Sequence, residues 1–211
     1  GTTDRALGES TRTLAAMLRT RSNPLVALLA CRRILRAVAV DRTQVKPKVA
    51  VIGEFWAMTT EGDGNYGLQR FLEQEGAEVD IQIVTNWVLY NIWEHSWDTR
   101  QRMVLRKDDN ANQGLVGVNV WQKLATLWVA DKGLRLVFKS IAGLLGLHDY
   151  YMPNMDEVAE EARELYNNHL RGGEGHMEVG KLVMNAEHKK STMTLSVKPF
   201  GCMPSSGVSD G

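Results

Sequence analysis

The chain has 211 residues, and its 25 Lys and Arg balance its 25 Asp and Glu, so the formal net charge at pH 7 is zero. A balanced charge argues against nucleic acid or an anionic membrane as the main partner, because both select basic surfaces. A hydrophobic content of 44% is ordinary for a globular protein with a buried core. The two cysteines lie far apart in the sequence and predict no disulfide framework, which favours a reducing, cytoplasmic setting.

The two ends of the sequence suggest a piece of a longer protein. It begins at Gly1 rather than at Met, and it stops at "VSDG" soon after an expected strand. No charged-then-apolar signal pattern opens the chain. The longest apolar stretch, residues 133–153, contains Arg135 and Lys139, so we expect no span across a bilayer.

Residues 1–45 predict a helical segment followed by a linker. Apolar residues recur at helical spacing, and Pro24 interrupts them, because proline suits the first turn of a helix but not its interior. We therefore expect two helices, at about 9–21 and 24–40. Cys31 lies in the apolar stripe of the second and is interpreted as a small buried thiol.

Residues 46–211 predict an α/β domain. The β-branched run at 48–55 is typical of a strand buried on both faces, and a Gly-rich loop, an amphipathic helix at 66–76 and a second strand within 77–87 follow it. This order is a βαβ unit, which implies parallel strands and a right-handed crossover. A large helical insertion is expected at about 86–190, before a third strand at 191–200.

Two segments should reach the carboxyl edge of this sheet, where ligands of open α/β sheets gather. One follows Gly53 and the other is "KPFGCMPSSG", which contains Gly201 and Cys202. The glycines of the first segment do not have the spacing of a phosphate-binding turn, and Glu54 with two bulky residues follows Gly53 directly. We therefore interpret this segment as a flexible loop or a lid on the substrate side rather than a nucleotide site.

Cys202 has three interpretations from its spacing alone. It is a structural residue, a ligand of an iron–sulfur cluster, or a nucleophile, and the last two roles need a thiolate. A cluster ligand needs partner cysteines, which the nearby sequence lacks. A nucleophile needs a histidine base; His176 and His188 are candidates, but the sequence does not place either near Cys202.

Two further stretches have both a structural and a functional interpretation. Glu174 precedes an expected helix, so it either caps that helix or presents a carboxylate to a site at the sheet edge. Trp87, Trp93 and Trp97 have helical spacing and are interpreted as core or as a domain interface.

Four stretches together resemble the 2-hydroxyacyl-CoA dehydratase (2-hydroxyglutaryl-CoA dehydratase) family, and most of all its acyl-CoA dehydratase activase-related branch. They are "KPKVAVIGEFW", "GNYGLQRFLEQEGAEV", "RGGEGHMEVGK" and "VKPFGCMPSSGVSDG". The resemblance covers about residues 46–211 and implies an incomplete Rossmann-like sheet. It also implies a 4Fe-4S cluster, an acyl-CoA substrate and a partner that hydrolyses ATP to deliver low-potential electrons.

Carried over to this sequence, the resemblance makes Cys202 a cluster ligand beside Gly201, with the loop after Gly53 and Glu54 facing the site. Glu54 and Glu174 are then the candidate catalytic carboxylates. The remaining ligands are expected outside this sequence, in the full-length chain or in a partner subunit. Alternatively, the chain is a non-catalytic interaction or scaffold module that kept the fold without a cluster, or a thiol-dependent hydrolase or transferase.

Overall fold

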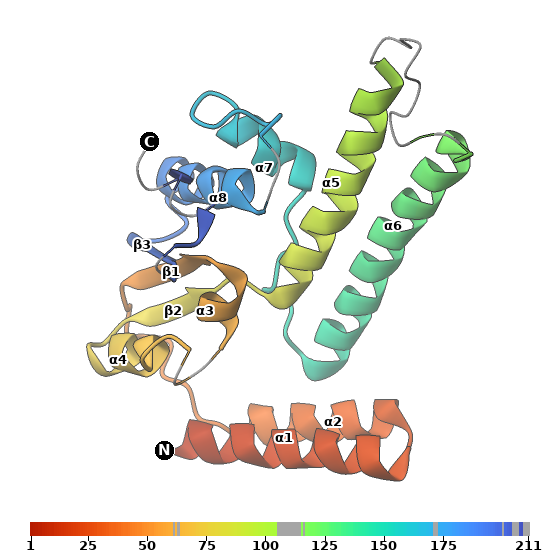
Figure 1. The fold of residues 1–211 in the computed structure, drawn as a ribbon. Coiled ribbons are helices and arrows are strands. Elements are labelled where there is room, and N and C mark those ends of the chain that lie inside the picture. Colours follow the sequence, from red (N-terminus) through yellow and green to blue (C-terminus); the bar gives the residue numbers. More distant parts are fainter. Residues whose placement is uncertain are drawn as a thin grey trace. The chain divides into compact units, whose positions relative to one another are not determined.

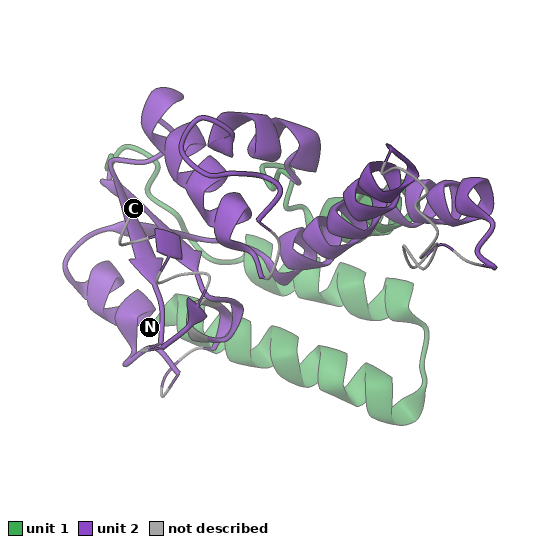
Figure 2. Ribbon diagram, turned by 45° about the horizontal axis from the view of Figure 1, so that its top comes forward, with its two compact units in different colours: residues 1–45, 132–151 green, residues 46–131, 152–211 purple. Residues whose placement is uncertain are grey.

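In the computed structural model the chain is a mixed α/β protein with a small parallel sheet (Figure 1). The structure describes residues 1–60, 62, 64–104, 115, 117–170, 173–199, 201–203 and 207–208, with the backbone alone at 57 and 58. These fall into two compact units (Figure 2). Unit 1 comprises residues 1–45 and 132–151, and unit 2 comprises residues 46–131 and 152–211.

Unit 1 contains a helical hairpin formed by α1 (Thr2–Thr20) and α2 (Pro24–Arg36). The start of α2 is explained by two residues of the sequence. The Asn23 side chain accepts a hydrogen bond from the Leu25 N–H at 2.9 Å, and Pro24 occupies the first turn of α2. The two predicted helices are thus confirmed, although α1 begins earlier than residue 9 and α2 ends before residue 40. Cys31 is buried, as predicted, and its thiol donates to the Ser10 carbonyl at 3.6 Å.

Unit 2 is built on three parallel strands in the order β2-β1-β3. Their bounds are β1 Lys48–Gly53, β2 Glu78–Ile81 and β3 Met193–Val197. In the register, Val51 pairs with Ile81 on one side and with Leu195 on the other. The parallel pairing predicted from the βαβ unit is confirmed, and the strands are shorter than the runs that predicted them.

The central strand β1 is buried on both faces, as its apolar run predicted. Val49 and Val51 point to one face, where they form a core with Leu72 and Ala77. Ala50 and Ile52 alternate with them and are 5% and 3% exposed on the other face. Figure 1 shows α4 (Leu68–Gln74) on one side of the sheet, with α7 (Met155–Ala162) and α8 (Gly175–Glu187) on the other.

The described chain between β2 and β3 is helical, as the sequence predicted. Its two longest helices are α5 (Val84–Val104) and α6 (Val120–Leu145), and α6 continues from unit 2 into unit 1. Two local expectations were wrong. Residues 84–87 begin α5 rather than ending a strand, and Phe55–Thr59 form a short helix, α3, where we expected the end of a strand and a loop.

Helices α7 and α8 cross closely at Gly180. A Cβ atom at this position would overlap the Val158 carbonyl oxygen, so the two backbones approach as only glycine allows. Val158 and Ala162 of α7 are almost completely buried in this contact region. Among the described residues, no helix combines the length and the apolar character needed to cross a membrane.

Candidate functional site at the carboxyl edge of the sheet

The carboxyl ends of β1 and β3 meet at Gly53 and Val197. The two residues are partners in the register, and the Glu54 N–H donates to the Val197 carbonyl at 2.8 Å. Gly53 has a φ of 119°, and a Cβ atom on it would overlap the Val197 backbone. Only glycine therefore permits this junction, which brings the two predicted loops out at the same edge.

This junction is also where the strand order reverses. From β1 the chain passes through α4 to β2 on one side, and it returns through the helices to β3 on the other side of β1. Ligands of open parallel sheets bind outside the carboxyl ends of the strands at such a reversal. The sequence placed Gly53 and Cys202 on segments leading to one edge, and the strand polarity confirms this.

Cys202 lies five residues beyond the last residue of β3. Its side chain is half-buried, and its backbone N–H donates to the Pro199 carbonyl at 3.3 Å. Gly201 turns the chain here with a φ of 87°. Neither Cys202 nor Cys31 is in a disulfide. The described part of the segment is thus a tight turn holding a half-buried thiol, whereas Ser205 and Ser206 lie outside the described residues.

Glu174 reaches the same edge from the start of α8. Its Oε1 accepts a hydrogen bond from the Phe55 N–H at 3.3 Å, and its side chain makes no capping bond to α8. Glu174 is the N-cap residue of α8, as the capping interpretation expected, but its carboxylate bonds to the segment after β1 instead of to the α8 backbone. Both interpretations of this residue, the helix start and the carboxylate at the sheet edge, are compatible with this position. A Cβ atom added to the neighbouring Gly175 would lie 3.4 Å from a methyl group of Val208, so Val208 lies near the start of α8.

Glu54 is the other candidate carboxylate. It follows Gly53 directly, and its half-buried side chain starts beside the end of β3, where its N–H is bonded to Val197. Both candidate carboxylates are therefore attached beside the β1–β3 junction, each by a hydrogen bond from a different backbone N–H group. Glu54 is fixed by its own N–H, and Glu174 is fixed by the next N–H along, that of Phe55.

The two histidines considered as bases for Cys202 lie in different places. His188 follows the C-terminal end of α8, at the end that leads into the start of β3, and its Nε2 is 4.0 Å from Glu161. His176 is at the edge end of α8 but only 1% exposed. Its ring lies 5.1 Å from that of Tyr90 and 5.2 Å from that of Trp93, so it belongs to a buried aromatic cluster.

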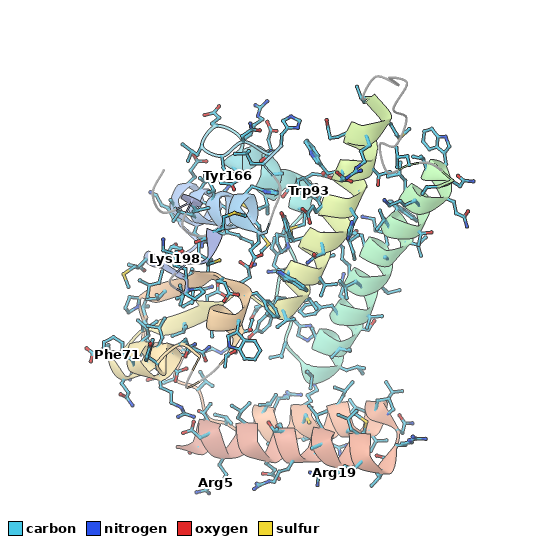
Figure 3. The ribbon with its side chains drawn as sticks, in the orientation of Figure 1. Arg5, Arg19, Phe71, Trp93, Tyr166 and Lys198 are labelled. Carbon is cyan, nitrogen blue, oxygen red and sulfur yellow. The ribbon has the colours of Figure 1, made fainter. Side chains whose placement is uncertain are left out.

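This aromatic cluster fixes the start of α8. The Tyr90 hydroxyl donates to the Gly173 carbonyl at 2.7 Å, and the Trp93 indole N–H donates to Asp156 at 2.7 Å. Figure 3 labels Trp93 on α5 and Tyr166 after α7. The Tyr166 ring is stacked on the His176 ring, with ring centroids 6.1 Å apart. The core interpretation is right for Trp93, which is 8% exposed.

Sequence reasoning missed a set of buried polar side chains near this edge. Asn65, in the loop after β1, is 5% exposed, and Asn86, in the first turn of α5, is 4% exposed. Glu178 on α8 is also buried and accepts a hydrogen bond from Ser196 of β3. The loop "DGNYG" signalled a turn, and nothing in the pattern of polar residues signalled that its asparagine would be buried.

The described residues do not contain a group of three or more His, Cys, Asp or Glu side chains arranged to hold a metal ion. The whole sequence has two cysteines, and Cys31 belongs to unit 1. An iron–sulfur cluster is held by several thiolates. Within unit 2 this chain can therefore contribute one thiolate, that of Cys202, and no complete set of cysteine ligands.

Comparison with protein-family models, with curated proteins and with solved structures finds no match to this chain.

Proposed function

We propose that the chain is an iron–sulfur component of a 2-hydroxyacyl-CoA dehydratase-like or activase-related system, with Cys202 as a cluster ligand. The position of Cys202 carries the proposal: it follows β3, whose end adjoins the end of β1 where the strand order reverses. A Rossmann-like sheet and a cytoplasmic setting are part of the same proposal. The small parallel sheet with helices on both faces supports the first of these.

The number of cysteines in the chain limits how many ligands it could supply to such a cluster. Cys202 supplies one thiolate, and the other ligands come from outside these 211 residues, in the remainder of the protein or in a partner subunit. When bound, the cluster supplies low-potential electron transfer for the removal of water from a 2-hydroxyacyl-CoA, with an ATP-hydrolysing activator as the electron source. The residues of this chain position the half-buried Cys202 thiol in a turn after β3.

Glu174 is proposed as a positioning residue rather than a catalytic one. Its carboxylate holds the Phe55 N–H, so it ties the segment after β1 to the start of α8. Val208 also lies near the start of α8, at Gly175. These contacts support a role in fixing the two loops that flank the junction of β1 and β3.

The matched pair of cysteine variants tests the proposal. In the full-length protein purified without oxygen, Cys202→Ser should lower the iron content and flatten the charge-transfer absorption. Cys31→Ala is the control, because this substitution also removes one thiol, but a buried one that belongs to unit 1. It should leave both signals unchanged.

An unchanged iron content in Cys202→Ser would dispose of the ligand assignment. It would favour the alternative proposal, a non-catalytic interaction module that kept the fold without a cluster. A thiol-dependent hydrolase would instead lose activity in Cys202→Ser with no change in iron.

A further inference from the structure

The formal charge of the chain is divided unevenly between the two units. Unit 1 contains 11 Lys and Arg against 4 Asp and Glu, and unit 2 contains 14 against 21, so their formal charges are +7 and −7. Such an asymmetry within one chain is typical of proteins that bind nucleic acid or an anionic membrane through the basic part. The zero net charge of the whole chain therefore gives no argument against an anionic partner of unit 1.

Unit 1 also leaves its large apolar side chains uncovered. All of its residues are described, and its buried ones are small: Ala6, Ser10, Ala27 and Cys31. Its leucines, valines and isoleucines are half-buried or exposed. Exposed apolar surface of this kind marks a site for a protein or a membrane. Combined with a basic charge, it is typical of helices that lie at the surface of an anionic bilayer.

Both properties are found at the closed end of the hairpin of α1 and α2, which pack side by side (Figure 1). Residues 18–26, "LRTRSNPLV", join the two helices and are all exposed. Leu18 is 71% exposed, Leu25 51% and Val26 66%. The segment also contains two arginines and no acidic residue. Residues 18–26 are called the hairpin tip below.

The backbone of the hairpin tip makes hydrogen bonds of its own. Arg21 ends α1 in the left-handed conformation, with a φ of 51°, and the Ser22 N–H donates to the Met17 carbonyl at 3.2 Å. The Asn23 side chain accepts the Leu25 N–H at the start of α2. Backbone groups that are bonded within the turn lower the cost of moving it from water into the bilayer interface.

A lipid surface fits these observations better than a nucleic acid does. Phosphate backbones are bound by basic and polar side chains and give no role to exposed leucine and valine. Single strands stack on aromatic side chains, and residues 1–45 contain none. An anionic bilayer, in contrast, attracts arginines to its headgroups and takes up aliphatic side chains just below them.

We propose that the hairpin tip binds the surface of an anionic membrane. Leu18, Leu25 and Val26 enter the interface, and Arg19 and Arg21 contact the lipid phosphates. The chain lies on the membrane in this arrangement and does not span it. The proposal concerns unit 1 and needs neither a thiolate nor iron, so it is independent of the proposed cluster.

Sedimentation of the whole chain with lipid vesicles tests the proposal. The chain should bind vesicles of phosphatidylcholine mixed with phosphatidylserine, and it should bind pure phosphatidylcholine vesicles at least about tenfold more weakly. Binding to the mixed vesicles should weaken as sodium chloride is added, because salt screens the arginines. Equal binding to both kinds of vesicle, or binding to neither, would overturn the proposal. So would tighter binding to duplex DNA at the same phosphate concentration, which would assign unit 1 to nucleic acid.

Leucine variants test whether the hairpin tip is the part that binds. Leu18→Ser with Leu25→Ser should weaken binding to the mixed vesicles by about tenfold or more, because two aliphatic side chains no longer enter the interface. The control is Leu7→Ser with Leu165→Ser, since both leucines are exposed. Leu7 lies about 16 Å from Leu18 along the axis of α1, and Leu165 belongs to unit 2. The control should bind as the wild type does, and an equal loss in both double variants would contradict a site at the tip.

Arginine variants test the contact with lipid phosphates in the same way. Arg19→Gln with Arg21→Gln should reduce the preference for phosphatidylserine by about tenfold. Arg5→Gln with Arg12→Gln removes the same charge from exposed positions of α1 farther from the turn and should have a smaller effect. If the two pairs lose equally, the charge of unit 1 as a whole attracts the lipid and the tip is not the site.

A measurement on the unsubstituted chain does not depend on how the variants fold. In bicelles of the same mixed lipids, a nitroxide group on the acyl chains broadens the NMR signals of nearby amides. The backbone signals of residues 18–26 should broaden, and those of residues 2–10, at the other end of α1, should not. Broadening at residues 2–10 without broadening at the tip would show that another part of the chain meets the bilayer, and the proposal would be wrong.

Discussion

At Gly53 the backbone of β1 passes so close to β3 that a side chain has no room. The residue has a φ of 119°, which L-residues with a side chain rarely adopt, and its Cβ position overlaps the Val197 backbone. Both features belong to the junction that carries Glu54 and leads to Cys202. A change of this one residue should therefore affect stability and the geometry of the candidate site together.

Gly53→Ala should lower the free energy of unfolding by about 2–4 kcal/mol, because it adds a backbone clash to an unfavourable φ. Gly76→Ala is the matched control: Gly76 also has a positive φ, 93°, but a Cβ there has no atom within 4 Å. It should cost only about 1 kcal/mol. Urea unfolding of both variants measures the difference, and a Gly53→Ala variant as stable as Gly76→Ala would show that the β1–β3 approach is not tight.

At the scale of elements, α8 connects the candidate site to the rest of unit 2. Its first residues lie at the carboxyl edge, where Glu174 bonds to Phe55, and its buried Glu178 bonds to Ser196 of β3. Its other face packs on α7 through Gly180. The position of the candidate carboxylate therefore depends on how closely α7 and α8 approach.

Gly180→Ala should destabilise the protein by about 2–4 kcal/mol, since the added methyl group overlaps the Val158 carbonyl and forces the helices apart. In an open helix the same change is favourable by about 0.5–1 kcal/mol. Gly133→Ala on α6 supplies this control, because a Cβ at Gly133 has no atom within 4 Å. In thermal unfolding, the melting temperature should fall for Gly180→Ala and rise for Gly133→Ala. A Gly180→Ala variant that melts above the wild type would contradict the close crossing of α7 and α8.

Across the whole molecule, sequence patterns predicted the elements and missed the contacts between distant elements. Runs of β-branched residues and helical spacing identified the three strands and most helices, because these patterns follow from local geometry. Strand polarity then placed Gly53 and Cys202 at one edge. The partner of Glu174 could not be predicted, since Phe55 lies 119 positions away in the sequence. The burial of Asn65 and Asn86 depends in the same way on tertiary packing.

The pH dependence of global stability offers a test at this scale. Burial lowers the pKa of Lys181 on α8 from 10.5 to about 8; repulsion by Lys190 adds to the effect, and Asp80 partly offsets it. Below pH 8 the lysine is charged in both states, so its burial destabilises the folded state fully. Between pH 8 and 10.5 the unfolded state binds more protons than the folded one, so the stability contribution of this group rises with pH.

Lys181→Met should therefore stabilise unit 2 at pH 7 by about 1–3 kcal/mol, and its advantage over the wild type should shrink as the pH rises from 8 to 10.5. All six tryptophans belong to unit 2, so their fluorescence during urea unfolding reports on this unit. Lys46→Met removes the same charge from an exposed position of unit 2 and should show no such pH-dependent difference. The other ionisable groups are common to both proteins and cancel in the comparison. An advantage of Lys181→Met that stays constant from pH 7 to 10.5 would mean that the methionine gains stability by packing, and that burial does not depress the titration of this lysine.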